Sequence, residues 1–281
     1  MRCVTLPGTE INVSRLSFGT ASLHHLPTSR RRQYLLVAAF DHGFTHFDTA
    51  PYYGYGIAEQ ELGLFLKGRQ GRVTITTKVG LYPPGGLYKN TASVWLRKIT
   101  GRVLPTFSRP VVDWSIAAAS KSLESSLRRL GIDHVDLLLL HEPAPNAIQS
   151  EVFLEWIENE RKKGKIRAQG FAGEANCMGT WLSTNHPLAM VLQVRDSLNR
   201  KEADTVRLHG RDLQITFGYF SSSATSHSSP KVAEILEGAL RRNTTGSVLV
   251  STRQLAHLYQ LAAIEERDNG DYDRLERIHP V

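Results

Sequence analysis

Short apolar runs alternate with amphipathic stretches along most of the chain. An uninterrupted apolar run is typical of a strand that is buried on both faces, as in parallel sheets covered by helices. Eight strand and helix pairs follow one another in this way, which is typical of βαβ units rather than of hairpins. The pattern therefore predicts an α/β fold of the (β/α)8 TIM-barrel type. The strands are predicted at Leu16 to Gly19, Thr45 to Asp48, Val73 to Lys78, Val135 to Leu140, Ala168 to Phe171, Met190 to Gln193, Gln214 to Phe217 and Val248 to Ser251.

The clearest helical pattern covers Ser115 to Leu130, where apolar residues recur at steps of three and four. Asp113 is the expected N-cap, and Gly131 supplies the C-terminal stop. Glu124 and Arg128 are expected to pair on the exposed side, because residues four apart are neighbours on a helix surface. Further helices are predicted at Arg30 to His42, Glu59 to Leu66, Glu151 to Lys163, Lys231 to Arg241 and Leu255 to Asp268.

The N-terminus and two long loops lie outside this repeating pattern. A short β-hairpin is expected from Cys3 to Leu6 and Ile11 to Val13. Tyr82 to Ser108 fits two interpretations, a solvated insertion and a cap over a pocket. Ser221 to Ser229 is expected to be a flexible loop. Because no linker or repeat divides the chain, residues 1–281 are expected to form one domain.

Composition is that of a globular protein, with 41% hydrophobic and 22% charged residues. No apolar run approaches the roughly 20 residues that a membrane-spanning helix needs, and the N-terminal segment MRCVTLPGTE lacks the apolar stretch of a secretory signal. The two cysteines, Cys3 and Cys177, are too few for a disulfide framework and are not spaced as metal ligands. We therefore expect a cytoplasmic protein with no membrane partner and no metal site.

The chain has 34 Lys and Arg residues against 27 Asp and Glu residues, which gives a formal net charge of +7. A basic protein suits an anionic partner, from a nucleotide phosphate to a nucleic acid. The basic residues are scattered along this chain, whereas a nucleic-acid binder gathers them on one face with aromatic residues between them. Binding of nucleic acid is therefore not expected.

Four residues with acid, base or hydrogen-bonding side chains fall at or near predicted strand ends. Asp48 ends the second strand, Tyr53 follows in the next loop, Lys78 ends the third strand, and His141 comes at the end of the fourth. Each of them alone has a structural explanation, such as a loop cap, a surface ion pair or a structural histidine. In a parallel barrel all strand C-termini open on one face, so these four side chains are expected to meet there.

Together the four groups predict proton transfer. A Lys78 ammonium held by the Asp48 carboxylate is expected to favour the phenolate of Tyr53 and so to lower the pKa of Tyr53 toward the working range. Tyr53 then becomes a usable proton donor, and His141 is expected to orient a carbonyl oxygen.

Two segments around these residues resemble the signatures of a known family, the aldo-keto reductases. The first is GFTHFDTAPYYGYGIAEQELG, in which an Asp and a Tyr precede a Gly and a Glu that opens the next helix. The second is SLRRLGIDHVDLLLLHEP, which contains the His of the proposed site. The resemblance takes in TTKVG and the strand order and extends from Leu16 to about Leu261. The long insertion and the following VVDWSIAAASKSLESSLRRLG resemble a bacterial branch that includes aldose and pyridoxal dehydrogenases, which leaves the direction of reaction open.

The resemblance implies a (β/α)8 barrel that binds an extended nicotinamide dinucleotide at its C-terminal face, without a GxGxxG motif. It implies that the catalytic tetrad is Asp48, Tyr53, Lys78 and His141. At the nicotinamide end it implies contacts from Gly19, Thr20, Ala21, Asp48, Gln193 and Phe217, of which Gln193 holds the carboxamide and Phe217 stacks on the ring. At the adenosine phosphates it implies contacts from Ser251, Thr252, Arg253 and His257. Without the resemblance, Gln193 and Phe217 are interpreted as a polar strand end and a core aromatic.

Two segments depart from the family pattern. The run GFAGEA has Ala172 and Gly173 where the family usually has a Ser-Asn pair, so Asn176 or Gln193 is expected to hold the carboxamide. The run SVLVSTRQLAHLYQLA matches the phosphate segment only loosely. Arg253 at the start of a helix suits a 2′-phosphate, so NADP is expected in preference to NAD, which stays the alternative.

The sequence therefore predicts an NAD(P)-dependent oxidoreductase that acts on a small aldehyde, ketone or sugar hemiacetal. The family resemblance implies exchange of the 4-pro-R hydride of nicotinamide. The alternative is a barrel that binds the dinucleotide as a sensor or regulatory subunit with little turnover. The complete tetrad favours the enzyme, whereas the missing Ser-Asn pair and the altered phosphate segment favour the alternative. The sequence does not indicate the oligomeric state.

Overall fold

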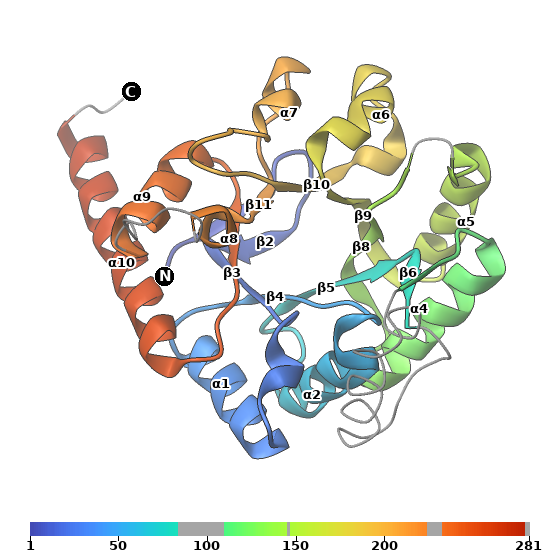
Figure 1. The fold of residues 1–281 in the computed structure, drawn as a ribbon, viewed down its shortest axis with the longest axis horizontal. Coiled ribbons are helices and arrows are strands. Elements are labelled where there is room, and N and C mark those ends of the chain that lie inside the picture. The colour runs from blue at the N-terminus through green and yellow to red at the C-terminus, as the bar shows by residue number, and fades with distance from the viewer. Residues whose placement is uncertain (84–109, 145–146, 224–231, 279–281) are drawn as a thin grey trace, which may run out of the picture.

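Parallel strands that close on themselves form the centre of the molecule (Figure 1). The computed structural model describes residues 1–83, 110–144, 147–223 and 232–278, and of residues 268–278 it describes the backbone alone. Its closed barrel has the order β3, β4, β5, β8, β9, β10, β11 and β12. These strands are β3 (Leu16–Gly19), β4 (His46–Asp48), β5 (Thr74–Val79), β8 (Val135–His141), β9 (Ile166–Gly173), β10 (Val191–Arg195), β11 (Ile215–Phe217) and β12 (Ser247–Val250). The predicted (β/α)8 barrel is confirmed.

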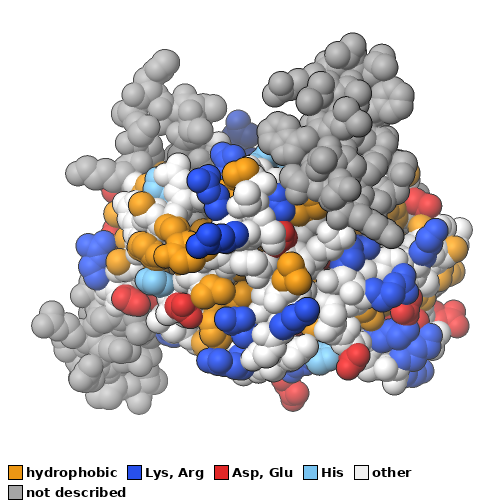
Figure 2. Space-filling view, turned by 90° about the horizontal axis from the view of Figure 1, so that it is seen from below, with side chains coloured by type: hydrophobic (Ala, Val, Ile, Leu, Met, Phe, Trp, Pro, Cys, Tyr) orange, Lys and Arg blue, Asp and Glu red, His pale blue; other side chains and the backbone are white. Residues whose placement is uncertain are grey.

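The longer helices surround the barrel in Figure 1. The described helices are α1 (Ser29–Asp41), α2 (Ile57–Leu66), α4 (Ile116–Leu130), α5 (Ser150–Lys162), α6 (Gly179–Ser183), α7 (Asp204–Leu208), α8 (Tyr219–Ser223), α9 (Val232–Arg242) and α10 (Leu255–Ile278). None of these helices is long and apolar enough to cross a membrane. On the face that Figure 2 shows, Lys and Arg side chains are spread among acidic and apolar ones rather than gathered into one patch.

The predicted N-terminal hairpin is present, and it fills one end of the barrel interior. Its strands are β1 (Cys3–Thr5) and β2 (Asn12–Ser14), which pair in antiparallel fashion. Leu6, Ile11 and Val13 from this hairpin belong to the same buried cluster as inward-facing strand residues such as Leu137 and Ile215. The hairpin therefore closes the barrel at the end where the strands begin, and the open mouth lies at their C-termini.

The two long loops fall largely outside the described residues. The antiparallel strands β6 (Leu81–Tyr82) and β7 (Val111–Val112) flank the predicted insertion Tyr82 to Ser108. Beyond residue 83, the segment that we interpreted as an insertion or a cap is not described. Ser221 to Ser223 belong to helix α8 rather than to the expected flexible loop, and residues 224–229 are not described.

Of the two caps predicted for α4, the N-terminal one is wrong and the C-terminal one is confirmed. The N-cap is Ser115, whose hydroxyl accepts a bond from the Ala118 N–H at 3.2 Å. The carboxylate of Asp113 instead accepts a hydrogen bond from the Ser115 N–H at 2.9 Å. This bond lies just before the first helical residue, Ile116. At the other end Gly131 has φ +65° and closes the helix, as predicted.

The predicted ion pair on the surface of α4 does not form. Glu124 binds the ammonium of Lys165, at the start of the neighbouring strand. Arg128 instead donates to the hydroxyl of Ser125 at 3.0 Å. Glu124 therefore pairs with Lys165, which is distant in sequence, instead of with Arg128 of its own helix.

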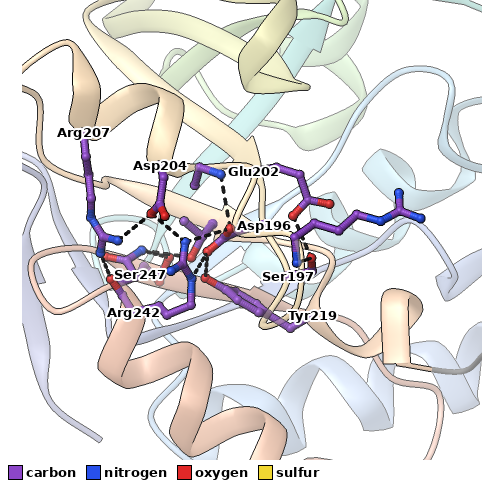
Figure 3. A network of polar contacts seen from close by, with 12 residues as sticks. Asp196, Ser197, Glu202, Asp204, Arg207, Tyr219, Arg242 and Ser247 are labelled. Carbon is purple, nitrogen blue, oxygen red and sulfur yellow. Dashed lines mark hydrogen bonds and ion pairs between the residues drawn. The ribbon is translucent and has the colours of Figure 1, made fainter. Parts of the chain in front are cut away.

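A buried carboxylate anchors the chain beyond β10 and β11 (Figure 3). Asp196 is fully buried and receives two bonds from Arg242 of α9, at 2.7 and 3.1 Å. The Tyr219 hydroxyl donates to Asp196 at 2.7 Å, and the Ala203 N–H donates at 3.1 Å. One carboxylate thereby links the segments that lead from β10 and β11 into α7, α8 and α9, and it fixes the ends of those two strands at the barrel mouth.

Candidate active site

The alternation of side chains along the strands decides which residues point into the barrel. Phe47 and Leu140 pack in the outer core, between the strands and the helices. The residues that follow them, Asp48 and His141, therefore point inward, and each is the last residue of its strand. Lys78 also points inward, one residue before the end of β5. The sequence prediction that these three side chains meet at one mouth is confirmed.

Tyr53 reaches this mouth through a tight turn after β4. It begins a short 3-10 helix, Tyr53–Gly56, in which Gly54 has φ +60°. A Cβ on Gly54 would lie 2.4 Å from the Cβ of His24, which packs against it. Glycine is needed here both for the left-handed backbone and for this close approach. The Gly that follows Tyr53 in the sequence signature is therefore what allows the turn.

Lys78 joins the acid, the phenol and a backbone carbonyl. Its Nζ lies 2.6 and 2.7 Å from the two carboxylate oxygens of Asp48, 3.0 Å from the carbonyl oxygen of Thr49, and 3.2 Å from the hydroxyl of Tyr53. Lys78 and Asp48 are each only 2% exposed. A buried ion pair of this kind holds its members in one geometry, because breaking it would leave a charge without a partner.

The environment raises the pKa of both Lys78 and Tyr53. Burial alone would lower the pKa of Lys78, but the Asp48 carboxylate and the Tyr53 oxygen hold it above its usual value, so the group stays an ammonium. Burial raises the pKa of Tyr53, and the nearby Lys78 ammonium only partly opposes that rise. The Lys78 ammonium thus favours the phenolate as expected, but burial outweighs its effect, so the pKa of Tyr53 is not brought toward the working range. Tyr53 is a protonated phenol at neutral pH.

His141 stands beside the phenol as a neutral imidazole. Its ring meets the Tyr53 ring edge to face, with centroids 5.9 Å apart and planes at 87°. Burial, together with the Lys78 charge, lowers the pKa of His141 to about 3. Its Nδ1 is buried and has no hydrogen-bond partner among the described residues. A neutral imidazole carries one N–H, so it can donate one hydrogen bond to an oxygen placed in the cavity.

These side chains surround a cavity of about 120 Å³ at the barrel mouth. Gln193 enters it from β10, and its Nε2 donates to Asp48 Oδ2 at 2.9 Å. Its Oε1 is buried and has no partner among the described residues, so it can accept a bond. Phe217 presents a ring from β11. The lining consists of Tyr53, Lys78, His141, Glu142, Ala172, Gly173, Gln193, Phe217 and Leu249.

The predicted cofactor residues of the first barrel loop lie behind this cavity. Thr20 donates to the carbonyl oxygen of Asp48 from its backbone N–H and from its hydroxyl, each at 2.9 Å. Gly19 lies close to the last strand, since a Cβ there would be 3.4 Å from the carbonyl oxygen of Val250. Ala21 is exposed. Thr20 therefore supports the backbone of Asp48, and none of the three lines the cavity.

The residues predicted for the adenosine phosphates also lie away from the central cavity. Arg253 lines a separate groove of about 790 Å³ between α1 and the start of α10, together with Arg30 and Arg31. Among the described residues, no acidic side chain forms an ion pair with these three guanidinium groups. The other members of the predicted set have only local partners or none recorded among the described residues. The hydroxyl of Ser251 lies 3.0 Å from the hydroxyl of Ser22, and the hydroxyl of Thr252 accepts a hydrogen bond from the Gln254 N–H at 3.1 Å. His257 is exposed.

Sequence reasoning missed Glu142, which lines the central cavity beside His141. Its place directly after His141 in LLHEP was the available signal, because a residue that follows an inward-facing strand end lies at the rim. Asn176, our candidate for the carboxamide, lines a neighbouring cavity instead. Among the described residues no three His, Cys, Asp or Glu side chains converge in a way that could hold a metal.

Comparisons with known proteins identify the family of this chain. Residues 15–209 match the model of the Aldo/keto reductase family. The chain is 30% identical over 216 residues to pyridoxal 4-dehydrogenase of Microbacterium luteolum, which covers 72% of this chain and 60% of that protein. It is 28% identical over 251 residues to D-threo-aldose 1-dehydrogenase of a Pseudomonas species, with 85% and 64% covered. The alignments thus span less than two thirds of the length of either relative.

Solved structures share the fold at lower identity. An aldo-keto reductase from Bacillus halodurans in its holo form superposes with a TM-score of 0.74 at 19% identity, over 95% of this chain and 91% of that one. An aldo-keto reductase from Klebsiella pneumoniae in complex with NADPH gives a TM-score of 0.70 at 23% identity, over 100% and 96%. The family model, the strand order and the described barrel point to the same conclusion. The chain belongs to the aldo/keto reductase family.

Proposed function

We propose that this protein is an NADP-dependent oxidoreductase that interconverts a carbonyl carbon with an alcohol, or a hemiacetal with its oxidised form. The observation that carries the proposal is the buried Lys78 ammonium, which contacts both Asp48 and Tyr53 beside a neutral His141 in one cavity. The family membership and the dehydrogenase names of the relatives support it.

In the reductive direction, Tyr53 gives its phenolic proton to the carbonyl oxygen while the carbonyl carbon receives a hydride. A nicotinamide held by these lining residues would supply that hydride when reduced and would accept one when oxidised. The proton and the hydride together convert the carbonyl into an alcohol. Lys78 stabilises the phenolate that remains on Tyr53, because its ammonium lies 3.2 Å from the phenolic oxygen. In the oxidative direction the Tyr53 oxygen takes the hydroxyl proton back.

His141 places the reacting oxygen. As a neutral imidazole it offers one N–H to the carbonyl oxygen and carries no charge that would compete with Lys78 for the phenolate. Its edge-to-face contact with Tyr53 brings the imidazole and the phenol to the same part of the cavity. We therefore assign proton transfer to Tyr53 and orientation to His141.

The lining residues suit a nicotinamide ring. Phe217 offers an aromatic face, and the buried Gln193 Oε1 is an acceptor without a partner among the described residues. Ala172 and Gly173 have no polar side-chain atoms, so Gln193 is the residue that we propose for the carboxamide. For the 2′-phosphate of NADP we propose Arg253, whose groove also contains Arg30 and Arg31.

The test measures oxidation and reduction of a panel of small aldehydes and sugars with NADP(H) and NAD(H). Tyr53→Phe removes the phenolic proton, so turnover should fall by about 10² to 10⁴ while the Kd for NADPH, from fluorescence, stays within about twofold. Tyr259→Phe is the matched control, because it also deletes a phenolic hydroxyl but lies on α10, where its ring stacks on His42. Equal turnover in the Tyr53 variant would exclude Tyr53 as the proton donor. Tight binding of NADPH by the native protein without turnover of any substrate would favour the regulatory barrel.

A further inference from the structure

Phe217 lines the central cavity from the end of a very short strand. Strand β11 has three residues, and Phe217 is the last of them. Gly218 follows with φ +104°, and a Cβ there would lie 3.0 Å from the Cγ of Arg195 and 3.3 Å from the carbonyl oxygen of Asp196. Glycine restricts the backbone less than any other residue, so strand pairing alone does not fix the path of the chain after Phe217. The position of the Phe217 ring therefore depends on what holds the residues around it.

Asp196 holds this segment on both sides of the glycine. Its N–H donates to the carbonyl oxygen of Phe217 at 2.8 Å, immediately before Gly218. Its carboxylate accepts a hydrogen bond at 2.7 Å from the hydroxyl of Tyr219, immediately after Gly218. Figure 3 shows the second of these bonds, with the Tyr219 ring pointing its hydroxyl at Asp196. We call this pair of bonds, from Asp196 to Phe217 and Tyr219, the Asp196 clamp.

The Asp196 clamp keeps one geometry because its polar groups are buried and paired. Asp196 is 0% exposed and Tyr219 is 1% exposed. The carboxylate also accepts two bonds from the guanidinium of Arg242, at 2.7 and 3.1 Å, and one from the Ala203 N–H at 3.1 Å. Burial raises the pKa of Tyr219 well above its usual value, and the Asp196 charge adds to the rise, so the phenol stays a donor. A buried network in which each charge is paired resists rearrangement.

The clamp residues act on the central cavity only through Phe217. Neither Asp196 nor Tyr219 lines that cavity. Phe217 itself is half-buried and presents its ring there. Stacking of aromatic rings depends on their relative offset and orientation, so the attraction that Phe217 offers depends on how firmly its ring is held.

We propose that Asp196 and Tyr219 are positioning residues, which hold the Phe217 ring in the orientation needed to stack on a nicotinamide. The proposal rests on the oxidoreductase function given above. It assigns part of the affinity for the nicotinamide half of the cofactor to two residues that do not line the cavity. The competing interpretation is that the Asp196 clamp only stabilises the fold, in which case its loss has no selective effect on the nicotinamide half.

The experiment measures the Kd for NADPH and the Kd for 2′,5′-ADP, which lacks the nicotinamide half. Phe217→Leu removes the ring and should raise the Kd for NADPH about threefold to tenfold, the usual worth of an aromatic pair. Tyr219→Phe keeps a buried ring and removes the bond to Asp196. It should raise the Kd for NADPH about threefold and the Kd for 2′,5′-ADP less than about 1.5-fold.

A double variant separates positioning from a purely structural role. If Tyr219 acts through the Phe217 ring, its own substitution has little left to change once that ring is gone. Tyr219→Phe should therefore change the Kd for NADPH by less than about 1.5-fold when Phe217→Leu is already present. If Tyr219→Phe does not fold, Arg242→Lys gives the same comparisons, because it keeps the positive charge beside Asp196 but cannot make both guanidinium bonds.

Asp204→Asn is the matched control. Asp204 also binds Arg242, at 2.9 Å, but its side chain is 44% exposed. Figure 3 shows it on the side of the network away from Tyr219. This variant should change neither Kd. The proposal is overturned by an unchanged Kd for NADPH in Tyr219→Phe, by an equal rise in both Kd values, or by an undiminished effect in the Phe217→Leu background.

Failure of the underlying function gives a different result. If the native chain binds neither NADPH nor 2′,5′-ADP, the NADP proposal fails, and the Asp196 clamp is judged without a ligand. Fluorine NMR of chains labelled with fluorophenylalanine supplies that measurement, since the Phe217 signal is the one that Phe217→Leu lacks. A shift or broadening of this signal in Arg242→Lys but not in Asp204→Asn supports the clamp. An unchanged signal in Arg242→Lys, or an equal change in Asp204→Asn, rejects it.

Discussion

Breaking the Asp48–Lys78 pair should strongly reduce stability, because the charge that remains cannot reach water. Both side chains are about 2% exposed, and both carboxylate oxygens of Asp48 contact the ammonium. Lys78→Met keeps most of the apolar stem and removes the charge. Asp48 would then retain only the Gln193 amide as a recorded side-chain donor. Removing one member of a buried ion pair costs about 3–5 kcal/mol, so we expect the unfolding free energy to fall by that amount at pH 8.

One further variant separates the unpaired charge from lost packing. The double variant Asp48→Asn with Lys78→Met contains no charge at the site, so its unfolding free energy should recover to within about 2 kcal/mol of the native value. Urea denaturation followed by circular dichroism gives all three values.

An exposed ion pair supplies the control. Arg241 and Glu237 of α9 are 68% and 41% exposed and lie 4.0 Å apart. Arg241→Met should change the unfolding free energy by no more than about 1 kcal/mol, because water screens such pairs. A loss below about 1 kcal/mol in Lys78→Met at pH 8, or an equal loss in the double variant, would refute the argument that the buried charges hold each other.

Two other predictions concern cofactor choice and acid stability. Arg253→Ala should raise the Kd for NADPH roughly tenfold, about 1.4 kcal/mol, and the Kd for NADH less than about threefold. The control variant Arg161→Ala, on α5, should change neither Kd. If fluorescence titrations show parallel shifts for NADPH and NADH in Arg253→Ala, then Arg253 does not recognise the 2′-phosphate. Burial, with the Lys78 charge, lowers the pKa of His46 to about 3, so the unfolded chain takes up the proton first as the pH falls below about 6.5. Stability is therefore lost on acidification, by about 2 kcal/mol between pH 7 and 5 for this residue. His46→Gln should remove that part of the pH dependence in urea denaturation, and an unchanged dependence would exclude it.

The barrel and the residues at its mouth could be predicted, because both depend on the local pattern of apolar residues and on the closure of parallel strands into one ring. Apolar runs fix the strands, and alternation along a strand fixes which neighbour points inward. Once Phe47 and Leu140 face the helices, Asp48 and His141 must face the interior. The helices α6 and α7 escaped prediction because each has five residues, too few to show a helical period.

The properties that could not be predicted depend on contacts between distant segments. One such property is the direction of the Tyr53 pKa shift. The sequence shows that the Lys78 charge lowers this pKa, but it does not show how completely the phenol is buried, and burial raises it. The partner of Glu124 is another, since Lys165 is 41 residues away along the chain. Ser115 and Asp113 are both good capping residues two positions apart, so composition alone does not choose between them.

The departure at Ala172 and Gly173 becomes intelligible once Glu142 is taken into account. The family usually has a Ser-Asn pair there, but a Cβ on residue 173 would come within 3.3 Å of the Glu142 backbone. Gly173 also has φ +155°, a backbone conformation that side chains rarely adopt, so an Asn at this position would be strained and would crowd Glu142. That arrangement leaves Gln193 as the buried amide with a free acceptor in the central cavity, which is why we assign it the nicotinamide carboxamide.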